Sequence, residues 1–406
     1  MHDNFDQEIP RKGTNSVKWE FGHEGDRLVH WEQTDKALGA DRVLPMWVAD
    51  MDFRCPEPVV DALVERARHG IFGYAMQTDS YVAALVSWMA RRQGWTVAPE
   101  WITVTPGVVV ALNALVRTFV APGEKVLIQP PVYPPFFTAI TNSGIEIAHN
   151  PLTYEQGRYT MDFASMEALV RDPAVTMAIL CNPHNPVGRV WTRDELQHFG
   201  ELCLENGVLV VADEIHGDLI YPGHVFTPFA SLGDALAENT IVCTAPSKTF
   251  NLAGLGTSNI ITPNAERRTR FEQALQTAGL FGVNPFGIVA LEAAYNYGED
   301  WLAQVMDYVA ENFRVLEAYL ARHLPQITAV RPEGTYLVWL DCRMLGLDKE
   351  ALERLMLHEA KLFLSEGYHF GVEGEGFERI NIACPRSILI DALKRIKAVV
   401  DHLTTV

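Results

Sequence analysis

The chain lacks a long apolar run, which argues against a membrane-spanning helix. No stretch of its 406 residues approaches the roughly 18 consecutive apolar side chains that such a helix needs. Residues 1–20, MHDNFDQEIPRKGTNSVKWE, are charged throughout and hold no apolar core like that of a signal peptide. We therefore expect neither a secreted protein nor a membrane protein.

Positive charge is also scarce. The chain has 33 lysines and arginines against 51 aspartates and glutamates, which gives a formal net charge of −18. Such a surface repels nucleic-acid phosphates and anionic lipids, so we expect no nucleic-acid or membrane partner. Solubility in the cytosol is the simplest reason for this acidity.

Cysteines are few, and the sequence contains no CxxC pair. The six cysteines are scattered, several of them within apolar runs, which indicates reduced core thiols in a reducing, cytoplasmic compartment. The histidines lack HExxH or paired spacing, so we expect no metal site. Glu214 and His216 are then better explained by structural or supporting roles than by metal binding.

Repeats, low-complexity tracts and long linkers are absent, but the middle of the chain has a clear rhythm. Short runs rich in Val, Ile and Leu are each followed by a helical pattern, at 124–129, 175–181, 208–214 and 240–245. Such runs are typical of strands buried on both faces. In the helix between the second and third runs, Thr192 and Glu195 form a capping-box pattern and Gly207 is a stop signal. This α/β alternation predicts a doubly wound, mainly parallel sheet.

The C-terminal part has a different pattern. We expect a long helix at 285–323 and further helices at 349–362 and 386–402, with strands at 335–341 and 379–383. These elements predict a smaller α+β domain. The predicted division is an N-terminal segment at 1–50 that joins the small domain, a large domain at 51–290 and the small domain at 291–406. The acidic stretch EGEGFE at 373–378 is most simply a solvated loop.

Polar side chains follow the four predicted strands. Ligands of open α/β sheets bind beyond the carboxyl ends of the strands, so these side chains should converge on one site. They are Tyr133 after the first run, Asn182 and Asn185 after the second, Asp213, Glu214 and His216 at the end of the third, and Ser247 and Lys248 after the fourth. Trp47 and Asp50 either line this site or pack at the domain junction.

Lys248 is the only charged side chain between Ile241 and Thr262. One interpretation is a lysine whose ammonium reaches solvent. The other is an amine whose pKa is lowered by burial and which forms an imine with a carbonyl.

A phosphate site is also predicted. TPGVVVALN at 105–113 is a glycine turn that leads into a helix, and its first amides, at Val108 and Val109, would attract an anion. Pyridoxal 5'-phosphate would use all of these groups. Lys248 would form the imine, Asp213 would hold the ring nitrogen protonated, Asn185 would bind the ring hydroxyl and Tyr133 would stack on the ring.

NPHNPVG, VADEIH and SKTFNLAG resemble the signatures of fold-type I pyridoxal-phosphate enzymes of aminotransferase class I/II. LPMWVADMDF, FGYA, PEGTYLVWLD and ERINIACPR are similar to the more specific strings of the MalY/PatB-type cystathionine β-lyase, or C–S lyase, branch. The resemblance covers nearly the whole chain and implies an aspartate-aminotransferase-like fold.

The resemblance also implies roles for individual residues. Arg379 would grip the substrate α-carboxylate, with Arg386 as an alternative, and Ala49 and Asn185 would also contact the substrate. Tyr74 would reach the neighbouring active site of a homodimer. Ser247, His216 and Tyr74 would help to hold the cofactor.

Two positions depart from the aminotransferase pattern. Gly256 stands where many of these enzymes have a phosphate-binding arginine, and His216 stands where they usually have a tyrosine. Both departures suit the lyase branch.

The sequence therefore predicts a pyridoxal-phosphate-dependent C–S β-lyase. Lys248 would remove the α-proton of L-cystathionine or another S-substituted cysteine, and thiol, pyruvate and ammonia would be released. An aminotransferase acting on an L-amino acid and a 2-oxo acid is the alternative, because its early steps are identical. A regulatory binding protein is a third hypothesis, although it would not need Lys248, Asp213 and Asn185.

Overall fold

The computed structural model describes residues 3–24, 27–31, 43–280 and 282–403. Residues 25–26 and 32–42 of the predicted N-terminal segment lie outside these ranges.

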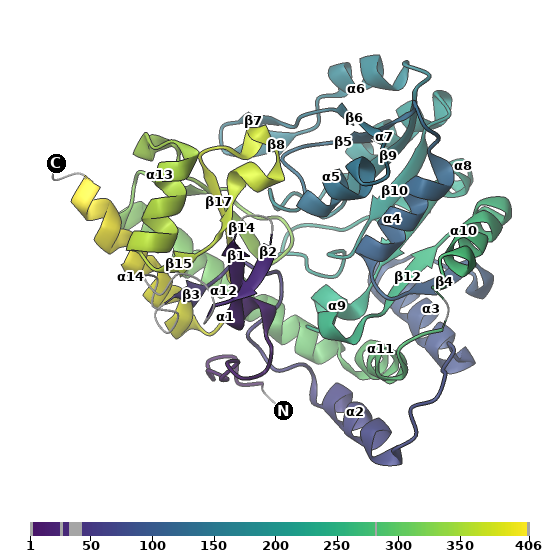
Figure 1. The fold of residues 1–406 in the computed structure, drawn as a ribbon, viewed down its shortest axis with the longest axis horizontal. Coiled ribbons are helices and arrows are strands. Elements are labelled where there is room, and N and C mark those ends of the chain that lie inside the picture. The colour runs from purple at the N-terminus through teal and green to yellow at the C-terminus, as the bar shows by residue number, and fades with distance from the viewer. Residues whose placement is uncertain (1–2, 25–26, 32–42, 281, 404–406) are drawn as a thin grey trace.

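A seven-stranded, mainly parallel sheet forms the centre of the larger part of the molecule (Figure 1). Its strand order is β4 (Ile102–Thr105), β12 (Ser258–Ile261), β11 (Thr240–Thr244), β10 (Leu209–Asp213), β9 (Val175–Cys181), β5 (Lys125–Ile128) and β6 (Glu146–His149). β12 runs opposite to the other six strands of this sheet. The predicted fold class is confirmed, and the four predicted strands are β5, β9, β10 and β11.

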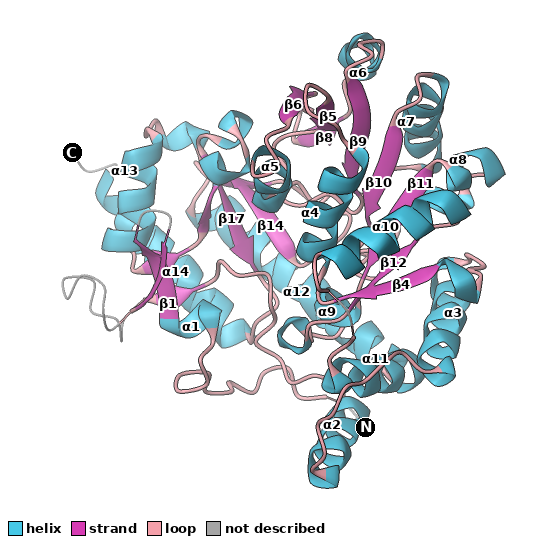
Figure 2. Cartoon of the chain, turned by 45° about the vertical axis from the view of Figure 1, so that its right-hand side comes forward, coloured by secondary structure: helices cyan, strands magenta, loops and turns pink. Residues whose placement is uncertain are grey.

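Side chains alternate between two hydrophobic clusters along each central strand. In β10, Leu209 and Val211 pack in one cluster, whereas Val210 and Ala212 pack in the other. This period of two is what a strand buried on both faces requires. Helices cover both faces (Figure 2). One cluster includes residues of α4 (Val108–Phe119), α5 (Pro134–Thr141) and α10 (Ala265–Thr277), and the other includes residues of α3 (Asp79–Gln93), α6 (Phe163–Val170), α7 (Arg193–Glu205), α8 (Asp234–Glu238) and α11 (Pro285–Tyr297).

The second sheet is antiparallel and lies on the other side of the molecule, with α13 (Lys349–Glu353) and α14 (Arg386–Leu403) (Figure 1). Its order is β13 (Thr328–Ala329), β14 (Leu337–Asp341), β17 (Phe377–Asn381) and β16 (Ser365–Glu366). The N-terminal region joins this part through β3 (Leu44–Pro45), which pairs with β15 (Leu362–Phe363). The predicted domain boundaries stay a prediction.

The long helix predicted at 285–323 is two helices, α11 and α12 (Glu299–His323), separated by Gly298. A Cβ at Gly298 would lie 2.5 Å from the Phe250 ring and 2.6 Å from the Ala294 carbonyl oxygen, so glycine permits this tight junction. The helix predicted at 349–362 is also wrong in its extent. α13 (Lys349–Glu353) continues as a π-helical turn at Arg354–Glu359, and the chain then enters β15.

The predicted capping box is confirmed at the start of α7, where Thr192 and Glu195 each accept the other's backbone N–H. The remaining helices are α1 (Val17–Glu20), α2 (Glu57–His69), α9 (Pro246–Thr249) and α14 (Arg386–Leu403). The remaining strands are β1 (Phe21–Glu24), β2 (Arg27–His30), β7 (Thr153–Glu155) and β8 (Arg158–Thr160). Short 3₁₀ turns occupy Pro99–Trp101, Phe229–Ser231, Ala253–Leu255, Arg343–Leu345, Gly367–Phe370 and Val372–Gly374. Within the described ranges, no helix is both long and apolar enough to cross a bilayer.

Candidate active site

The carboxyl ends of β5, β9, β10 and β11 border one cavity of about 190 Å³. Among the side chains considered for the site, Trp47, Asp50, Tyr74, Asn182, Glu214 and Arg379 do not line this cavity, whereas nine others do. The nine are Ala49, Val108, Val109, Tyr133, Asn185, Asp213, His216, Ser247 and Lys248. These residues are far apart in the sequence, and the fold brings them together beyond the strand ends, where ligands of such sheets bind.

Lys248 lies in the short helix α9, directly after β11, and its side chain faces this cavity. Its Nζ donates a hydrogen bond of 2.7 Å to the Ala49 carbonyl oxygen. Burial lowers the pKa of Lys248 to about 8, and nearby Asp50 and Asp213 only partly oppose this effect. The amine is therefore held inside the protein and loses its proton more readily than an ordinary lysine.

Asp213 ends β10 on the face that α4 covers. In register beside it stand Cys181 of β9 and Cys243 of β11, neither of which is a cation. Burial raises the pKa of Asp213 to about 7. In the described part of the chain, no cationic side chain lies within ion-pair distance of this carboxylate. A buried acid of this kind suits a ligand that brings its own positive charge.

The N-terminus of α4 forms another wall of the cavity. Val108, Val109 and Val110 line it, and no side chain among the described residues caps the helix at Gly107. A Cβ placed at Gly107 would have no heavy atom within 4 Å, so there is room for a group at this position. Backbone N–H groups and the positive end of the helix dipole thus face an open space that suits an anion.

Tyr133, Asn185 and His216 complete the walls. Burial raises the pKa of Tyr133 to about 12, so its ring carries no charge at neutral pH. Burial also holds the pKa of His216 far below its ordinary value, and nearby Lys248 and Arg379 add to this effect. Among the described residues, His216 Nδ1 is buried without a hydrogen-bond partner.

Arg379 of β17 lies behind this wall and not on the cavity surface itself. Its NH1 donates to Asn185 Oδ1 at 3.0 Å, and its NH2 donates to the Trp47 carbonyl oxygen at 2.8 Å and to Ser365 Oγ at 2.9 Å. Within the described ranges, the buried Nε has no partner. Burial lowers the pKa of Arg379 to about 10, which still leaves it charged at neutral pH.

Arg386, the alternative to Arg379, opens α14 and points elsewhere. Its Nε donates to Asn312 Oδ1 at 3.2 Å, and its guanidinium lies over the Tyr308 ring. The geometry therefore favours Arg379.

Residues 47–50, which we call the strap, are held by hydrogen bonds from side chains to their backbone carbonyl oxygens. Each of the four carbonyl oxygens accepts a side-chain hydrogen bond: Trp47 from Arg379 and Ser365, Val48 from Asn381, Ala49 from Lys248 and Tyr336, and Asp50 from Asn381. Both charged side chains predicted to act on the substrate, Lys248 and Arg379, are thus tied to this one segment. Sequence reasoning did not find Ser365, Asn381 or Tyr336, because each reads as an ordinary strand residue.

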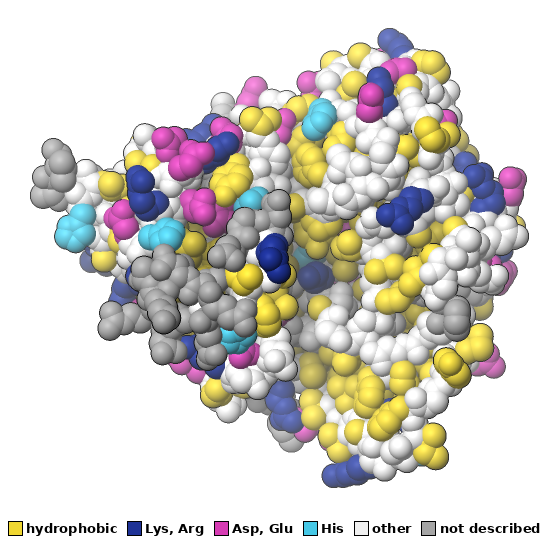
Figure 3. Space-filling model, in the orientation of Figure 1, with side chains coloured by type: hydrophobic (Ala, Val, Ile, Leu, Met, Phe, Trp, Pro, Cys, Tyr) yellow, Lys and Arg dark blue, Asp and Glu magenta, His cyan; other side chains and the backbone are white. Residues whose placement is uncertain are grey.

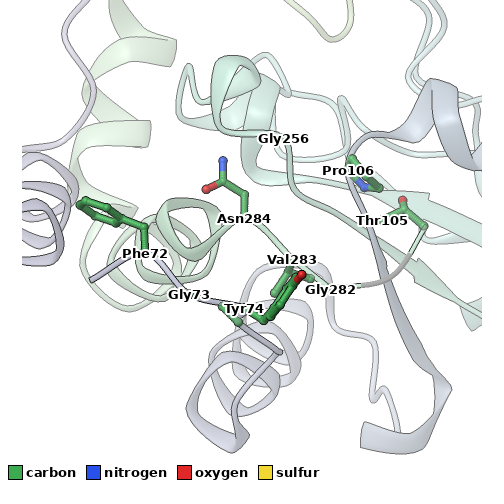
Figure 4. Close-up of a pocket in the computed structure, with 10 residues that line it drawn as sticks. Phe72, Gly73, Tyr74, Thr105, Pro106, Gly256, Gly282, Val283 and Asn284 are labelled. Carbon is green, nitrogen blue, oxygen red and sulfur yellow. The ribbon is translucent and has the colours of Figure 1, made fainter. Parts of the chain in front are cut away.

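Tyr74 lies outside the cavity of its own chain, and its side chain is fully exposed. It lines a neighbouring cavity of about 490 Å³ with Phe72, Val283 and Gly256, among others (Figure 4). Pro106 lines both cavities, so they adjoin. Gly256 has a φ of +54°, in the left-handed region that disfavours an arginine at this position.

Pyridoxal 5'-phosphate fits these groups. The amine of Lys248 faces Asp213 across a cavity with an aromatic wall, and uncapped helix amides lie at one end. An aldehyde, a protonated ring nitrogen and a phosphate would match the amine, the unpaired acid and the helix terminus, respectively.

Comparison with known proteins agrees with this interpretation. Residues 42–396 match the family model described as aminotransferase class I and II. The chain is 47% identical to the cystathionine β-lyase PatB of Bacillus subtilis, and the match covers 97% of this chain and 99% of that protein.

Solved structures give the same result. Cystalysin from Treponema denticola, which contains a pyridoxal 5'-phosphate cofactor, is 38% identical with a TM-score of 0.94, over 99% of this chain and 100% of that one. The pyridoxal-phosphate-bound C–S lyase from Staphylococcus hominis is 33% identical with a TM-score of 0.88, over 98% of each chain.

Proposed function

The chain belongs to the aminotransferase class I and II family, and from that premise we propose the reaction that it catalyses. It is a pyridoxal-phosphate-dependent carbon–sulfur lyase. Its proposed substrate is L-cystathionine or another S-substituted cysteine, which yields a thiol, pyruvate and ammonia. The observation that carries the proposal is the cavity lined by both the amine of Lys248 and the buried acid Asp213, which has no ion-pair partner among the described residues.

Five groups of the chain would hold the cofactor. Asp213 would bind the ring nitrogen, Asn185 the ring hydroxyl and Tyr133 the ring face, with the α4 amides and Ser247 around the phosphate. Pyridoxal phosphate, when bound, supplies an aldehyde for the substrate amine and a ring that withdraws electrons from the α-carbon.

Arg379 is the proposed ligand of the substrate α-carboxylate. It is already fixed by Asn185, Trp47 and Ser365, and its buried Nε is unpartnered among the described residues. A guanidinium held in this way loses little side-chain entropy when a carboxylate binds. Ala49, on the wall beside Lys248, is the proposed neighbour of the substrate.

Lys248 is the proposed base. Because burial brings its pKa to about 8, a useful fraction of the amine is neutral near neutral pH. Lys248 Nζ would take the α-proton and hold it while the thiolate leaves the β-carbon. His216 would stay neutral beside it, because burial opposes its protonation.

We further propose a cytoplasmic homodimer. Hydrophobic side chains gather on the lower right of the face in Figure 3, around α2 and α11. Ile71, Phe72, Tyr74 and Met76 are exposed in the segment that follows α2. A second copy that covers these side chains would bring its own Tyr74 towards the cavity that holds Lys248. All six cysteines are free thiols, in keeping with a reducing compartment.

The test is pyruvate and thiol release from L-cystathionine by the purified, cofactor-loaded protein. It is run with and without a 2-oxo acid other than pyruvate, with Lys248→Ala as the control. Equal amounts of pyruvate and thiol without the oxo acid, lost in the variant, are expected. Amino-group transfer to the oxo acid without thiol release from any cysteine conjugate would instead identify an aminotransferase, and activity in neither assay would favour a regulatory binding protein.

A further inference from the structure

Tyr336 lies deep in the molecule, directly before β14, and its side chain is 1% exposed. Its hydroxyl donates a hydrogen bond of 2.9 Å to the Ala49 carbonyl oxygen. This is the oxygen that accepts the Lys248 ammonium at 2.7 Å. A tyrosine that precedes a strand of the second sheet and the proposed catalytic lysine, which follows a strand of the first, therefore share one acceptor.

The strap is held on both sides of the shared oxygen. Asn381 donates to the carbonyls on either side of it, those of Val48 and Asp50. Tyr336 is also fixed, since its own carbonyl accepts the Ile382 N–H at 3.0 Å and its ring packs 6.2 Å from that of His216. The strap and Tyr336 are therefore both anchored by contacts that do not depend on Lys248.

We propose that Tyr336 is a positioning residue for Lys248: by sharing the Ala49 carbonyl oxygen, its hydroxyl sets the direction of the amine and limits how strongly the strap holds the ammonium. A carbonyl oxygen has two lone pairs and accommodates both donors. An acceptor that serves two donors polarises less towards each of them than an acceptor that serves one. The inference rests on the proposed function, because Tyr336 would affect the reaction only by positioning Lys248.

Other charged groups face the amine as well. Asp50 of the strap and Asp213 of β10 favour the ammonium, whereas Arg379 of β17 disfavours it. His216, which follows β10, is neutral because of its burial. Tyr336 differs from Asp50, Asp213 and Arg379, because it acts on the proton of Lys248 without carrying a charge, and from His216, because it shares the hydrogen-bond acceptor of the amine. Burial raises the pKa of Tyr336 far above its ordinary range, so the hydroxyl remains a donor throughout the working pH range.

The first test measures the amine of Lys248 without turnover. The full-length protein, stripped of cofactor, is treated with cyanate, which reacts with neutral amines, and carbamylation of Lys248 is followed by mass spectrometry between pH 6 and pH 10. Tyr336→Phe keeps the ring and removes the hydroxyl. Tyr221→Phe is the matched control: this hydroxyl is also buried, has no partner among the described residues and lies outside the proposed site.

In Tyr336→Phe, Ala49 accepts from Lys248 alone and holds the ammonium more firmly. The labelling profile should therefore move to higher pH, and the rate at neutral pH should fall by about twofold to fourfold, because the hydrogen bond from the ammonium strengthens by a fraction of its value. Tyr221→Phe should leave the profile in place. A Tyr336→Phe profile that matches that of Tyr221→Phe, or one that moves to lower pH, would overturn the proposal.

A second readout uses the loaded enzyme. In Tyr336→Phe, the acid limb of the plot of kcat against pH should move to higher pH. A merely structural defect would lower kcat at every pH without moving the limb. Because labelling needs no turnover, a wrong assignment of the reaction would leave the labelling result intact. The two proposals thus fail in different experiments.

Discussion

Arg379 has the geometry of a carboxylate ligand, and its replacement by lysine should separate binding from chemistry. A lysine lacks the planar fork and cannot keep the bonds to Asn185, Trp47 and Ser365 together. We expect Arg379→Lys to raise KM by about tenfold to a hundredfold, the value of a charge-assisted hydrogen bond, with a smaller effect on kcat.

Arg386→Lys is the matched control for this change. Arg386 contacts Asn312 and the Tyr308 ring, away from the cavity, so KM should stay near that of the natural enzyme. Steady-state kinetics with L-cystathionine checks both variants. A larger rise of KM in Arg386→Lys than in Arg379→Lys would contradict the assignment.

At the scale of single residues, the sequence predicted the centre of the site better than its surroundings. Lys248, Asp213 and Asn185 each follow an apolar run, and the geometry of a parallel sheet brings such positions together. Tyr336 precedes a run that has the composition of a core strand. Its contact with Ala49 joins residues that are distant in the sequence, and no local pattern encodes such a contact.

The strand pair β16–β17 holds two acids at opposite positions. Glu366 and Glu378 pair in register. Phe377 and Glu378 are each 2% exposed and begin β17, so the prediction of a solvated loop at 373–378 was wrong at these two residues. Burial raises the pKa of both carboxyls, repulsion from Glu353 adds to the effect on each, and repulsion from Glu366 raises the pKa of Glu378 further. The strand pair thus favours the protonated acids.

Both pKa values lie above those of the unfolded chain, so the folded state binds more protons at these two acids. Their contribution to the free energy of unfolding should therefore fall as the pH rises above about 4.3. Glu378→Gln removes one of the two acids. We expect the variant to lose less stability than the natural protein between pH 5.5 and pH 8.5, by about 1–3 kcal/mol in urea unfolding.

Glu375→Gln is the control for this prediction, because Glu375 is exposed and pairs with Lys349 on the surface. Its stability should follow pH as that of the natural protein does. Equal pH dependence in Glu378→Gln and Glu375→Gln would show that the buried pair does not titrate as described.

At the scale of elements, the sequence predicted four strands of the large sheet, but it missed β12 and the edge strands β4 and β6. β5, β9, β10 and β11 are continuous apolar runs because both of their faces are covered. β6 is at an edge with mixed burial, and β12 reads SNII, so neither has the composition that marks a buried strand. At the break between α11 and α12, Gly298 lies against Phe250, which is distant in the sequence. The apolar periodicity of the two helices contains no sign of this contact.

The N-terminal region is fastened to the rest of the molecule by buried charges. Lys18 is 0% exposed and lies 2.6 Å from Asp52, which also accepts hydrogen bonds from Arg11 and Trp19. Burial alone would raise the pKa of Asp52, but Lys18 and these donors lower it. Its contribution to stability is therefore present above the ordinary pKa of an aspartate and is lost as the pH falls through its folded pKa.

Asp52→Asn should destabilise the whole molecule, because it removes the carboxylate that lies 2.6 Å from the buried Lys18 and leaves the more distant Asp50, at 3.9 Å, as the remaining counter-charge among the described residues. We expect a loss of about 3–5 kcal/mol in the free energy of unfolding at pH 7. Glu57→Gln breaks the exposed pair with Arg54, whose atoms lie 2.8 Å apart, and should cost less than about 1 kcal/mol. Denaturant unfolding of both variants checks the difference, and equal losses would refute it.

The proposed dimer has a test that depends on two copies. Tyr74→Ala and Lys248→Ala should each be inactive if Tyr74 acts in the neighbouring site. When the two variants are unfolded and refolded together, mixed dimers contain one complete site, so about a quarter of the natural activity should return. If Tyr74 acts within its own chain or has no role in the site, mixing will restore nothing beyond the sum of the separate activities.

The way in which the strap is held has a consequence for directed evolution. Lys248, Arg379, Asn381 and Tyr336 all bind its backbone oxygens, and a backbone oxygen is present whatever side chain the residue carries. Ala49 lines the cavity, so a library at this position would alter the space beside the substrate while it leaves the tether of the lysine in place. Position 49 is thus a place where new leaving groups could be selected without rebuilding the catalytic apparatus.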